Sequence, residues 1–186
     1  MTGGRIGGLI VRRARADEFE RLADIVVAAY ESIGALEGDD EYVPELRDVA
    51  RRAHEAVVLV AADAATNEPL GCATYVPDES SPFAEMLVPG EAAIRMLAVA
   101  PEAQGRGAGS ALAAACVALA RAAGKRRLCL HSLPLMAGAQ RIYVRMGFLR
   151  DQARDWQFAP DGFLLAFALQ LDEPADAAEP KAAAPA

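Results

Sequence analysis

Hydrophobic residues recur along this chain with two periods, and the alternation of the periods predicts strands and helices. An apolar run at Leu9–Val11 predicts a short strand, and apolar residues three and four positions apart over Asp17–Tyr30 predict an amphipathic helix. Pro44–His54 follows as a second predicted helix. Two apolar runs separated by a short polar turn, Val57–Asp63 and Leu70–Val76, then predict a β-hairpin.

The second half of the chain continues as alternating strands and helices. Ala92–Val99 predicts a strand that ends before Pro101, and the alanine-rich segment Gly109–Ala123 predicts a helix that Gly124 terminates. The elements that follow are a strand, a helix and two strands, at Arg127–Ser132, Ala137–Met146, Phe148–Arg150 and Phe163–Leu171. A hairpin followed by this alternation predicts a mixed sheet with helices on its faces, of the α/β or α+β class.

The two ends of the chain differ in composition from the middle. Residues 1–8 have little to bury, and residues 172–186 are rich in alanine, proline and acids without a large apolar side chain. Such segments are typical of disorder. We therefore expect a single domain over residues 9–171, between a disordered N-terminus and a disordered C-terminal tail.

Charge and cysteine content exclude several classes of protein. With 19 basic and 26 acidic side chains the net charge is −7, which disfavours a nucleic-acid partner. No apolar run reaches the roughly 20 residues that a membrane helix needs, and no secretory signal is evident. Cys72, Cys116 and Cys129 are far apart in apolar surroundings, which is typical of reduced thiols. We expect a cytoplasmic protein with neither a membrane partner nor a metal.

A glycine-rich loop joins the strand at Ala92–Val99 to the following helix. The segment PEAQGRGAGSALAAA contains glycine at every second position, at Gly105, Gly107 and Gly109. A strand, a glycine turn and a helix N-terminus together build an anion site, because unpaired N–H groups converge there and the helix dipole adds a favourable potential. Arg106 adds a candidate charge contact. The alternative is that the glycines only make a tight connection.

Spacing discriminates among the known phosphate-binding patterns. The dinucleotide fingerprint G-x-G-x-x-G fails, because the sixth position counted from Gly105 or from Gly107 is not glycine. The P-loop fails as well, because the Gly124–Lys125 pair is followed by arginine. The pattern that fits is Gln-x-x-Gly-x-Gly over Gln104–Gly109, and it resembles the coenzyme A pyrophosphate loop of the GNAT superfamily of N-acetyltransferases.

This resemblance extends over most of the chain. IRMLAVAPEAQGRGAGSAL (Ile94–Leu112) resembles the central strand, loop and helix of the family, and AQRIYVRMGF (Ala139–Phe148) resembles its later signature A-x-x-[LI]-Y-x-x-x-G-F. The order of elements over Leu9–Leu171 also agrees. The resemblance implies a mixed, mostly antiparallel central sheet of 6–7 strands with helices on both faces and a splayed parallel strand pair. It further implies an acetyl-CoA-dependent N-acetyltransferase, in which a primary amine attacks the co-substrate directly within a ternary complex.

The resemblance also implies where acetyl-CoA binds. The family's central strand is bulged and diverges from the next parallel strand, so that main-chain groups can pair with the pantetheine arm. By position these groups belong to Leu97, Ala98 and Val99. The pyrophosphate would be held by the N–H groups of the loop, namely those of Gln104, Gly105, Arg106, Gly107, Ala108, Gly109 and Ser110.

Tyr143, within the second motif, is the candidate general acid. The coenzyme A thiolate needs a proton as it departs, and a phenol with an ordinary pKa of about 10 is protonated at neutral pH. Similar proteins place a tyrosine at this position for that purpose. The alternative is that Ile142, Tyr143 and Met146 form the buried stripe of an amphipathic helix, and the surrounding motif favours the catalytic role.

The base that deprotonates the amine is not given by the motif. Many relatives carry a glutamate immediately before the Ile-Arg pair of the central strand, and this chain has Ala93 there. Glu91 lies two residues earlier, on the same side of the strand by alternation, and is the candidate base acting through a water. The alternative for Glu91 is a solvated carboxylate at the end of the strand.

A second departure concerns the position seven residues before the tyrosine. Many relatives have an asparagine there, and this chain has Met136. Ser132, at the end of the preceding strand, is a candidate substitute. His131 beside it either reaches the cleft or caps the strand. Because of these two departures, the protein could instead be a sensor that binds acyl-CoA and has lost catalysis. A further alternative function is to carry another phosphorylated ligand.

Acidic segments give the indication about the acceptor. Residues 31–45 contain six acids and residues 78–91 contain four, and neither segment has a lysine or arginine. Both segments border the acceptor entrance in similar proteins. They favour a cationic acceptor, either a small-molecule amine or a protein amine, although such acids can equally be solvated surface charge. A homodimer is possible on the family's pattern.

Overall fold

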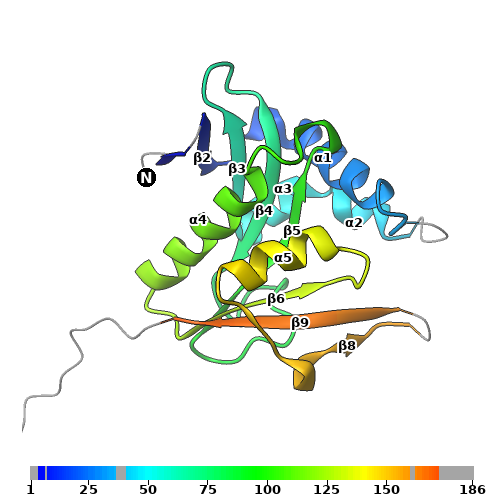
Figure 1. Ribbon diagram of the computed structural model, residues 1–186, viewed down its shortest axis with the longest axis vertical. Helices are drawn as coiled ribbons and strands as arrows, with labels where there is room; N and C mark the ends of the chain where they lie inside the picture. Colours follow the sequence, from blue (N-terminus) through cyan, green and yellow to red (C-terminus); the bar gives the residue numbers. More distant parts are fainter. Residues whose placement is uncertain (1–3, 7, 37–40, 160–161, 172–186) are drawn as a thin grey trace, which may run out of the picture.

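The computed structural model describes residues 4–6, 8–36, 41–159 and 162–171 (Figure 1). Its strands are β1 (Gly4–Ile6), β2 (Leu9–Arg13), β3 (Val57–Asp63), β4 (Pro69–Val76), β5 (Glu91–Val99), β6 (Arg127–Ser132), β7 (Leu149–Arg150), β8 (Trp156–Gln157) and β9 (Phe163–Gln170). Its α-helices are α1 (Phe19–Glu31), α2 (Val43–Arg47), α3 (Val49–Glu55), α4 (Ala108–Ala122) and α5 (Ala137–Arg145).

The strands form one mixed sheet in the order β1-β2-β3-β4-β5-β6-β9-β7, and β8 pairs with β9 beside this path. Every adjacent pair is antiparallel except β5 and β6, which are parallel. The predicted class is confirmed. The sheet has nine strands rather than six or seven because β1, β7 and β8 are pairings of two or three residues, too short to show a period in the sequence.

Two predicted boundaries differ from the structure. Gly4–Ile6 lie in the N-terminal segment that we expected to be disordered, and their backbone pairs with β2 as the edge strand β1. The predicted helix Pro44–His54 is divided into α2 and α3 at Asp48, whose side chain accepts the Arg51 N–H at 3.0 Å as an N-cap. The predicted tail over residues 172–186 lies outside the described residues.

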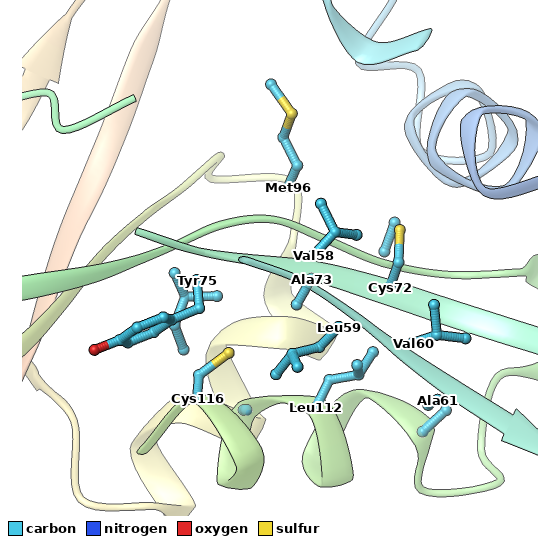
Figure 2. Close-up of a cluster of buried hydrophobic side chains, with 14 of the residues drawn as sticks. Val58, Leu59, Val60, Ala61, Cys72, Ala73, Tyr75, Met96, Leu112 and Cys116 are labelled. Atoms are coloured by element: carbon cyan, nitrogen blue, oxygen red, sulfur yellow. The ribbon is translucent and has the colours of Figure 1, made fainter. Parts of the chain in front are cut away.

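Helices cover both faces of the sheet. Helix α1 lies against β4 and β5 on one face, and α4 lies against β3, β4 and β5 on the other. Figure 2 shows Leu112 and Cys116 of α4 beside Leu59 of β3, with Met96 across the sheet from them. All three cysteines are buried and unpaired. Within the described ranges, none of the helices combines the length and apolar character needed to span a bilayer.

The parallel strands β5 and β6 diverge, and this divergence positions the site. They pair only from Glu91 opposite Arg127 to Ile94 opposite Leu130. Beyond that point β6 follows β9 as far as Ser132, whereas β5 stays with β4 as far as Val99. A bulge in β5 falls between Arg95 and Ala98, where Met96 has a φ of 48°. The predicted splayed pair is therefore present.

Candidate functional site

The diverging end of β5 exposes main-chain groups to the gap between β5 and β6. Ala98 pairs with Cys72 and Val99 pairs with Gly71, both on the β4 side. The register with β6 ends at Ile94, so among the described strands Leu97–Val99 have no partner on the β6 side. An extended ligand that carries amides can pair with such an edge as a missing strand would. The structure thus places the three predicted strand residues along one open edge.

The glycine loop requires glycine for its backbone conformation. Gly105 and Gly107 have φ of 80° and 86°, in the left-handed region. A Cβ built on either residue would meet no atom within 4 Å, so the space in front of both is open. Gly109 differs, since its Cβ would lie 3.3 Å from the Ile142 Cδ1. Gly109 therefore allows α4 and α5 to approach each other, while Gly105 and Gly107 leave room for a ligand.

The start of α4 supplies free donors next to this open space. Gly107 is the N-cap of the 15-residue helix, and its carbonyl accepts the Ala111 N–H at 3.0 Å. The N–H groups of Ala108, Gly109 and Ser110 thus have no helical carbonyl to donate to. The Gln104 N–H, by contrast, donates to the Pro101 carbonyl at 3.4 Å. Free donors at the positive end of a helix dipole suit a phosphate.

Arg106 lies in the loop but is directed toward β3. Its guanidinium donates to Asp63 Oδ2 at 2.6 Å. Asp63 also accepts the N–H groups of Ala65 and Thr66, and the bonds from Ala65 and Arg106 hold the pKa of Asp63 below its usual range. To contact a pyrophosphate directly, Arg106 would have to exchange this carboxylate for the ligand.

Tyr143 is buried between α5 and the sheet. It is 5% exposed, and its ring centroid lies 5.7 Å from that of Phe148 and 6.3 Å from that of Phe167. Burial, with a smaller contribution from Cys116, raises the pKa of the Tyr143 phenol above its usual range. The phenol is consequently protonated at any working pH, and its hydroxyl has no hydrogen-bond partner among the described residues.

A cavity of about 320 Å³ opens at the gap on the sheet face that carries α1 and α2. Most of its wall is apolar or aromatic, from Tyr30, Tyr42, Phe83, Leu87, Leu133, Met136, Trp156, Phe158, Leu164 and Phe167. The strand residues Ala93–Met96 also line it. Its charged or titratable members, besides the tyrosines and Cys129, are Glu45, Glu85, Arg95, His131, Asp151 and Arg154. Such a mostly apolar wall with a few polar groups is typical of a small-molecule site.

Tyr143 and the cavity adjoin each other through the sheet. Phe167 contacts the Tyr143 ring and also lines the cavity. Burial raises the pKa of Tyr30 in the cavity wall, and the neighbouring Tyr42 and Tyr143 hydroxyls raise it further. Phe167 is thus the residue that connects the buried Tyr143 ring to the cavity wall.

Most charges of the cavity are paired. Arg95 forms an ion pair with Glu85, and although burial opposes the charge, that carboxylate raises the pKa of Arg95. Asp151 pairs with Arg127 at 2.6 Å. Arg95 is a cavity residue that the sequence motifs do not indicate; its charge within the otherwise apolar centre of β5 is the signal that could have identified it.

Glu91 is held away from the cavity. Its side chain is 2% exposed and does not line the cavity, whereas Arg154 does. Arg154 Nη1 lies 2.9 Å from both carboxylate oxygens, Arg127 Nη1 lies 3.2 Å from one of them, and the Val88 N–H also donates to it. These contacts connect the turn at Gln152–Arg154 to the sheet. The structure thus does not bring Glu91 and Tyr143 together.

Glu91→Gln distinguishes a structural role from a basic one. We expect it to lower the free energy of unfolding by about 2–4 kcal/mol, because Arg127 and Arg154 lose the carboxylate that compensates them. Urea denaturation measures the change, with the exposed Glu79→Gln of the preceding loop as the control. Unchanged stability together with lost turnover would instead identify Glu91 as the base.

The remaining candidates fall in two places, the cavity wall and the buried end of β6. Met136 and Ala93 both line the cavity, so the two departures from the family pattern lie in its wall. Ser132 is buried, and its hydroxyl donates weakly to the Leu133 carbonyl at 3.4 Å. His131 lines the cavity. Across the described part of the chain, no three His, Cys, Asp or Glu side chains gather as metal ligands.

Comparison with known proteins agrees with this geometry. The model of a family described as Acetyltransferase (GNAT) family matches residues 19–148. Among solved structures, a GNAT-family acetyltransferase from Staphylococcus aureus Mu50 has a TM-score of 0.70 at 12% identity, covering 88% of this chain and 99% of its own. The Salmonella typhimurium protein yncA, solved with its cofactor acetyl-CoA, has a TM-score of 0.61 at 19% identity, covering 90% and 96%.

A third structure adds a named acceptor in a similar fold. The ribosomal-protein-S5-alanine acetyltransferase from Vibrio fischeri has a TM-score of 0.64 at 12% identity, covering 91% of this chain and 97% of its own. No curated protein sequence matches this chain. At these identities the structural likeness shows the fold alone.

Proposed function

The chain belongs to the acetyltransferase (GNAT) family, and from this premise we propose that it transfers the acetyl group of acetyl-CoA to a primary amine by direct attack within a ternary complex. Acetyl transfer is the activity of the family. The acceptor and the residues that act on it are our proposal. The observation that carries it is the open edge Leu97–Val99, which leads from the cavity toward the free donors at the start of α4.

We assign acetyl-CoA to the open edge of β5 and the glycine loop, because the edge suits the pantetheine arm and the loop suits the pyrophosphate. The open main-chain groups of Leu97–Val99 suit the amides of a pantetheine arm. The N–H groups of Ala108–Ser110 and the open space at Gly105 and Gly107 suit a pyrophosphate. When bound, acetyl-CoA supplies an activated acyl carbon and a thiolate leaving group. We assign Tyr143, which burial keeps protonated, as the proton donor to that sulfur.

The acceptor amine enters, on this proposal, from the cavity on the opposite face. Glu45 and Glu85 belong to the two acidic segments and line the cavity. Glu85 is paired with Arg95, so Glu45 is the carboxylate that favours a cationic amine. The aromatic side chains around them provide faces on which a cation or an apolar body can rest. Both a small amine and the N-terminus of a protein fit this description. Three buried, unpaired cysteines support a reducing compartment, and we place the activity in the cytoplasm.

Release of coenzyme A thiol in the presence of amines tests the proposal. The probes are spermidine, phenylethylamine and a peptide with an N-terminal alanine, the last chosen from the S5-alanine acetyltransferase of similar fold. We expect thiol release above the amine-free rate with at least one probe, and mass spectrometry should show one added acetyl group on that amine. Binding of acetyl-CoA without release by any probe would favour the sensor, an alternative that Ala93 and Met136 in the cavity wall support.

A further inference from the structure

We propose that His131 is the base that removes the proton from the acceptor amine, an inference that rests on the proposed function. His131 lies near the end of β6, past the point where β6 leaves β5, and it lines the acceptor cavity. An alkylammonium with a pKa near 10.4 has no lone pair for attack at neutral pH, so a proton acceptor is required. Ala93 leaves the central strand without a carboxylate at the middle of the cavity wall.

One hydrogen bond determines which nitrogen of the ring is basic. His131 Nε2 lies 3.0 Å from the carbonyl oxygen of Arg154. A carbonyl only accepts hydrogen bonds, so Nε2 carries the hydrogen and Nδ1 of the neutral ring has a free lone pair. Histidine is also the side chain that most readily exchanges a proton between pH 5 and 8. In this arrangement the hydrogen bond of Nε2 orients the His131 ring, and the lone pair of Nδ1 can accept a proton.

The carbonyl that orients the ring is itself anchored. The Arg154 guanidinium is held by both oxygens of the buried Glu91 at 2.9 Å and also donates to the Met86 carbonyl. Glu91 thus acts through Arg154, as a positioning residue for His131. This gives the buried carboxylate a place in the site without requiring it to reach the amine.

The other ionisable groups around His131 either form ion pairs or are uncharged. Glu85 pairs with Arg95, and Asp151 pairs with Arg127. Asp155, next to Arg154 in the turn, pairs with Arg150 at 2.8 Å. Burial raises the pKa of the Cys129 thiol on the same strand to about 11, so it stays neutral. The facing residues of β9, Leu165–Phe167, carry no ionisable group.

Among the described residues of the cavity wall, Glu45 is the competing candidate base. It lies in α2 and is exposed. An exposed carboxylate in α2 can attract a cationic amine, whereas His131 lies where β6 leaves β5, so we assign the proton transfer to His131. His54, the other histidine, is exposed in α3 and does not line the cavity, so His54→Gln serves as the matched control.

Every proton of the acetyl transfer can be assigned to His131, Tyr143, the amine or solvent. His131 Nδ1 takes one proton from the ammonium, which frees the nitrogen lone pair. The C–N bond to the acetyl carbon forms, the C–S bond breaks, and the departing sulfur takes the Tyr143 hydroxyl proton. The nitrogen then loses its second proton, which restores the Tyr143 phenol. His131 releases its proton to solvent, so the products are the amide, free coenzyme A thiol and one proton.

Kinetics of His131→Gln, with the probe amine that the wild-type protein acetylates fastest, test the inference. The glutamine amide can still donate to the Arg154 carbonyl but cannot accept a proton at neutral pH. We expect kcat/KM to fall about 100-fold, with the acetyl-CoA melting shift unchanged. His54→Gln should leave kcat/KM unchanged. Added imidazole should partly restore the rate of His131→Ala.

The pH profile gives a readout that a structural role would not move. In the wild-type protein kcat/KM should level off below the pKa of the amine, because His131 deprotonates the bound ammonium. In His131→Gln it should keep rising until the amine itself ionises. Wild-type turnover with a rate and profile unchanged in His131→Gln would overturn the inference alone. Absence of wild-type turnover with all three probes would overturn the proposed function beneath it.

A measurement that needs no acceptor amine tests which nitrogen of the His131 ring carries the hydrogen. The chain has two histidines, so ¹⁵N-histidine NMR gives two rings, and His131→Gln assigns them. We expect the neutral His131 ring to be protonated at Nε2 and unprotonated at Nδ1. A ring protonated at Nδ1 would have no free nitrogen for the amine, and the inference would be wrong.

Discussion

Replacing Tyr143 with phenylalanine is expected to lower kcat for acetyl transfer about 100-fold or more, while the Kd for acetyl-CoA changes less than about twofold. The range follows from what a positioned proton donor contributes to a rate. Phenylalanine fills the same space against Phe148 and Phe167. The lost hydroxyl has no partner among the described residues, so the fold should keep its stability. The variant thus removes the proton that the departing thiolate needs and little else.

Tyr75 provides a matched control for this experiment. It is buried in β4, and its hydroxyl also lacks a hydrogen-bond partner. Figure 2 shows its ring beside Cys116, on the same side as α4. Tyr75→Phe should leave kcat unchanged, since Tyr75 belongs to β4 and lies outside both family motifs. Full activity in Tyr143→Phe, or equal losses in both variants, would contradict the role of Tyr143 as the acid.

Gly107→Asp is expected to weaken acetyl-CoA binding about 100-fold, and Gly107→Asn about 10-fold or less. Aspartate and asparagine have nearly the same size, and both tolerate the left-handed backbone better than other residues do. A Cβ at Gly107 meets no atom within 4 Å, so either side chain has room. Only the aspartate brings a negative charge within a few ångströms of the expected pyrophosphate, where repulsion amounts to a few kcal/mol before screening by salt.

Calorimetric titration of acetyl-CoA into both variants separates charge from shape. Helix N-termini favour an acid, so Gly107→Asp should be at least as stable as Gly107→Asn while it binds acetyl-CoA more weakly. Stability and affinity then move in opposite directions, which a general loss of folding cannot produce. Equal affinities of the two variants would mean that no phosphate lies at the start of α4.

Local patterns in the sequence predicted much of this structure. Period and turn residues located the hairpin Val57–Val76 and the helices α1, α4 and α5 within a few residues. Gly124 was predicted to end α4, and it does so with a φ of 65° while the Lys125 N–H donates to the Ala120 carbonyl. The glycine loop and the splayed strands were predicted from a motif within one segment. In each case the determining residues are neighbours in the sequence.

Contacts between distant segments could not be predicted in this way. The charge pattern left the role of Glu91 open, because its partner Arg154 lies 63 residues away. Arg106 likewise pairs with Asp63, 43 residues away, which no local signal indicates. The cavity is assembled from α1, α2, β5, β6, β8 and β9 and from loops between them, so its lining emerges only once the chain is folded. The division between α2 and α3 at Asp48, by contrast, could have been predicted from the sequence, because aspartate is a preferred N-cap residue.

The thermal melting shift with acetyl-CoA, with NAD and ATP as controls, tests the central claim that the open edge of β5 and the glycine loop bind acetyl-CoA. A ligand at about a hundred times its Kd stabilises a protein by roughly 2.7 kcal/mol. For a domain of this size the melting temperature should rise on the order of 5–10 °C. We predict this rise with acetyl-CoA and a much smaller one with NAD or ATP. No rise, or an equal rise with the three ligands, would contradict the claim.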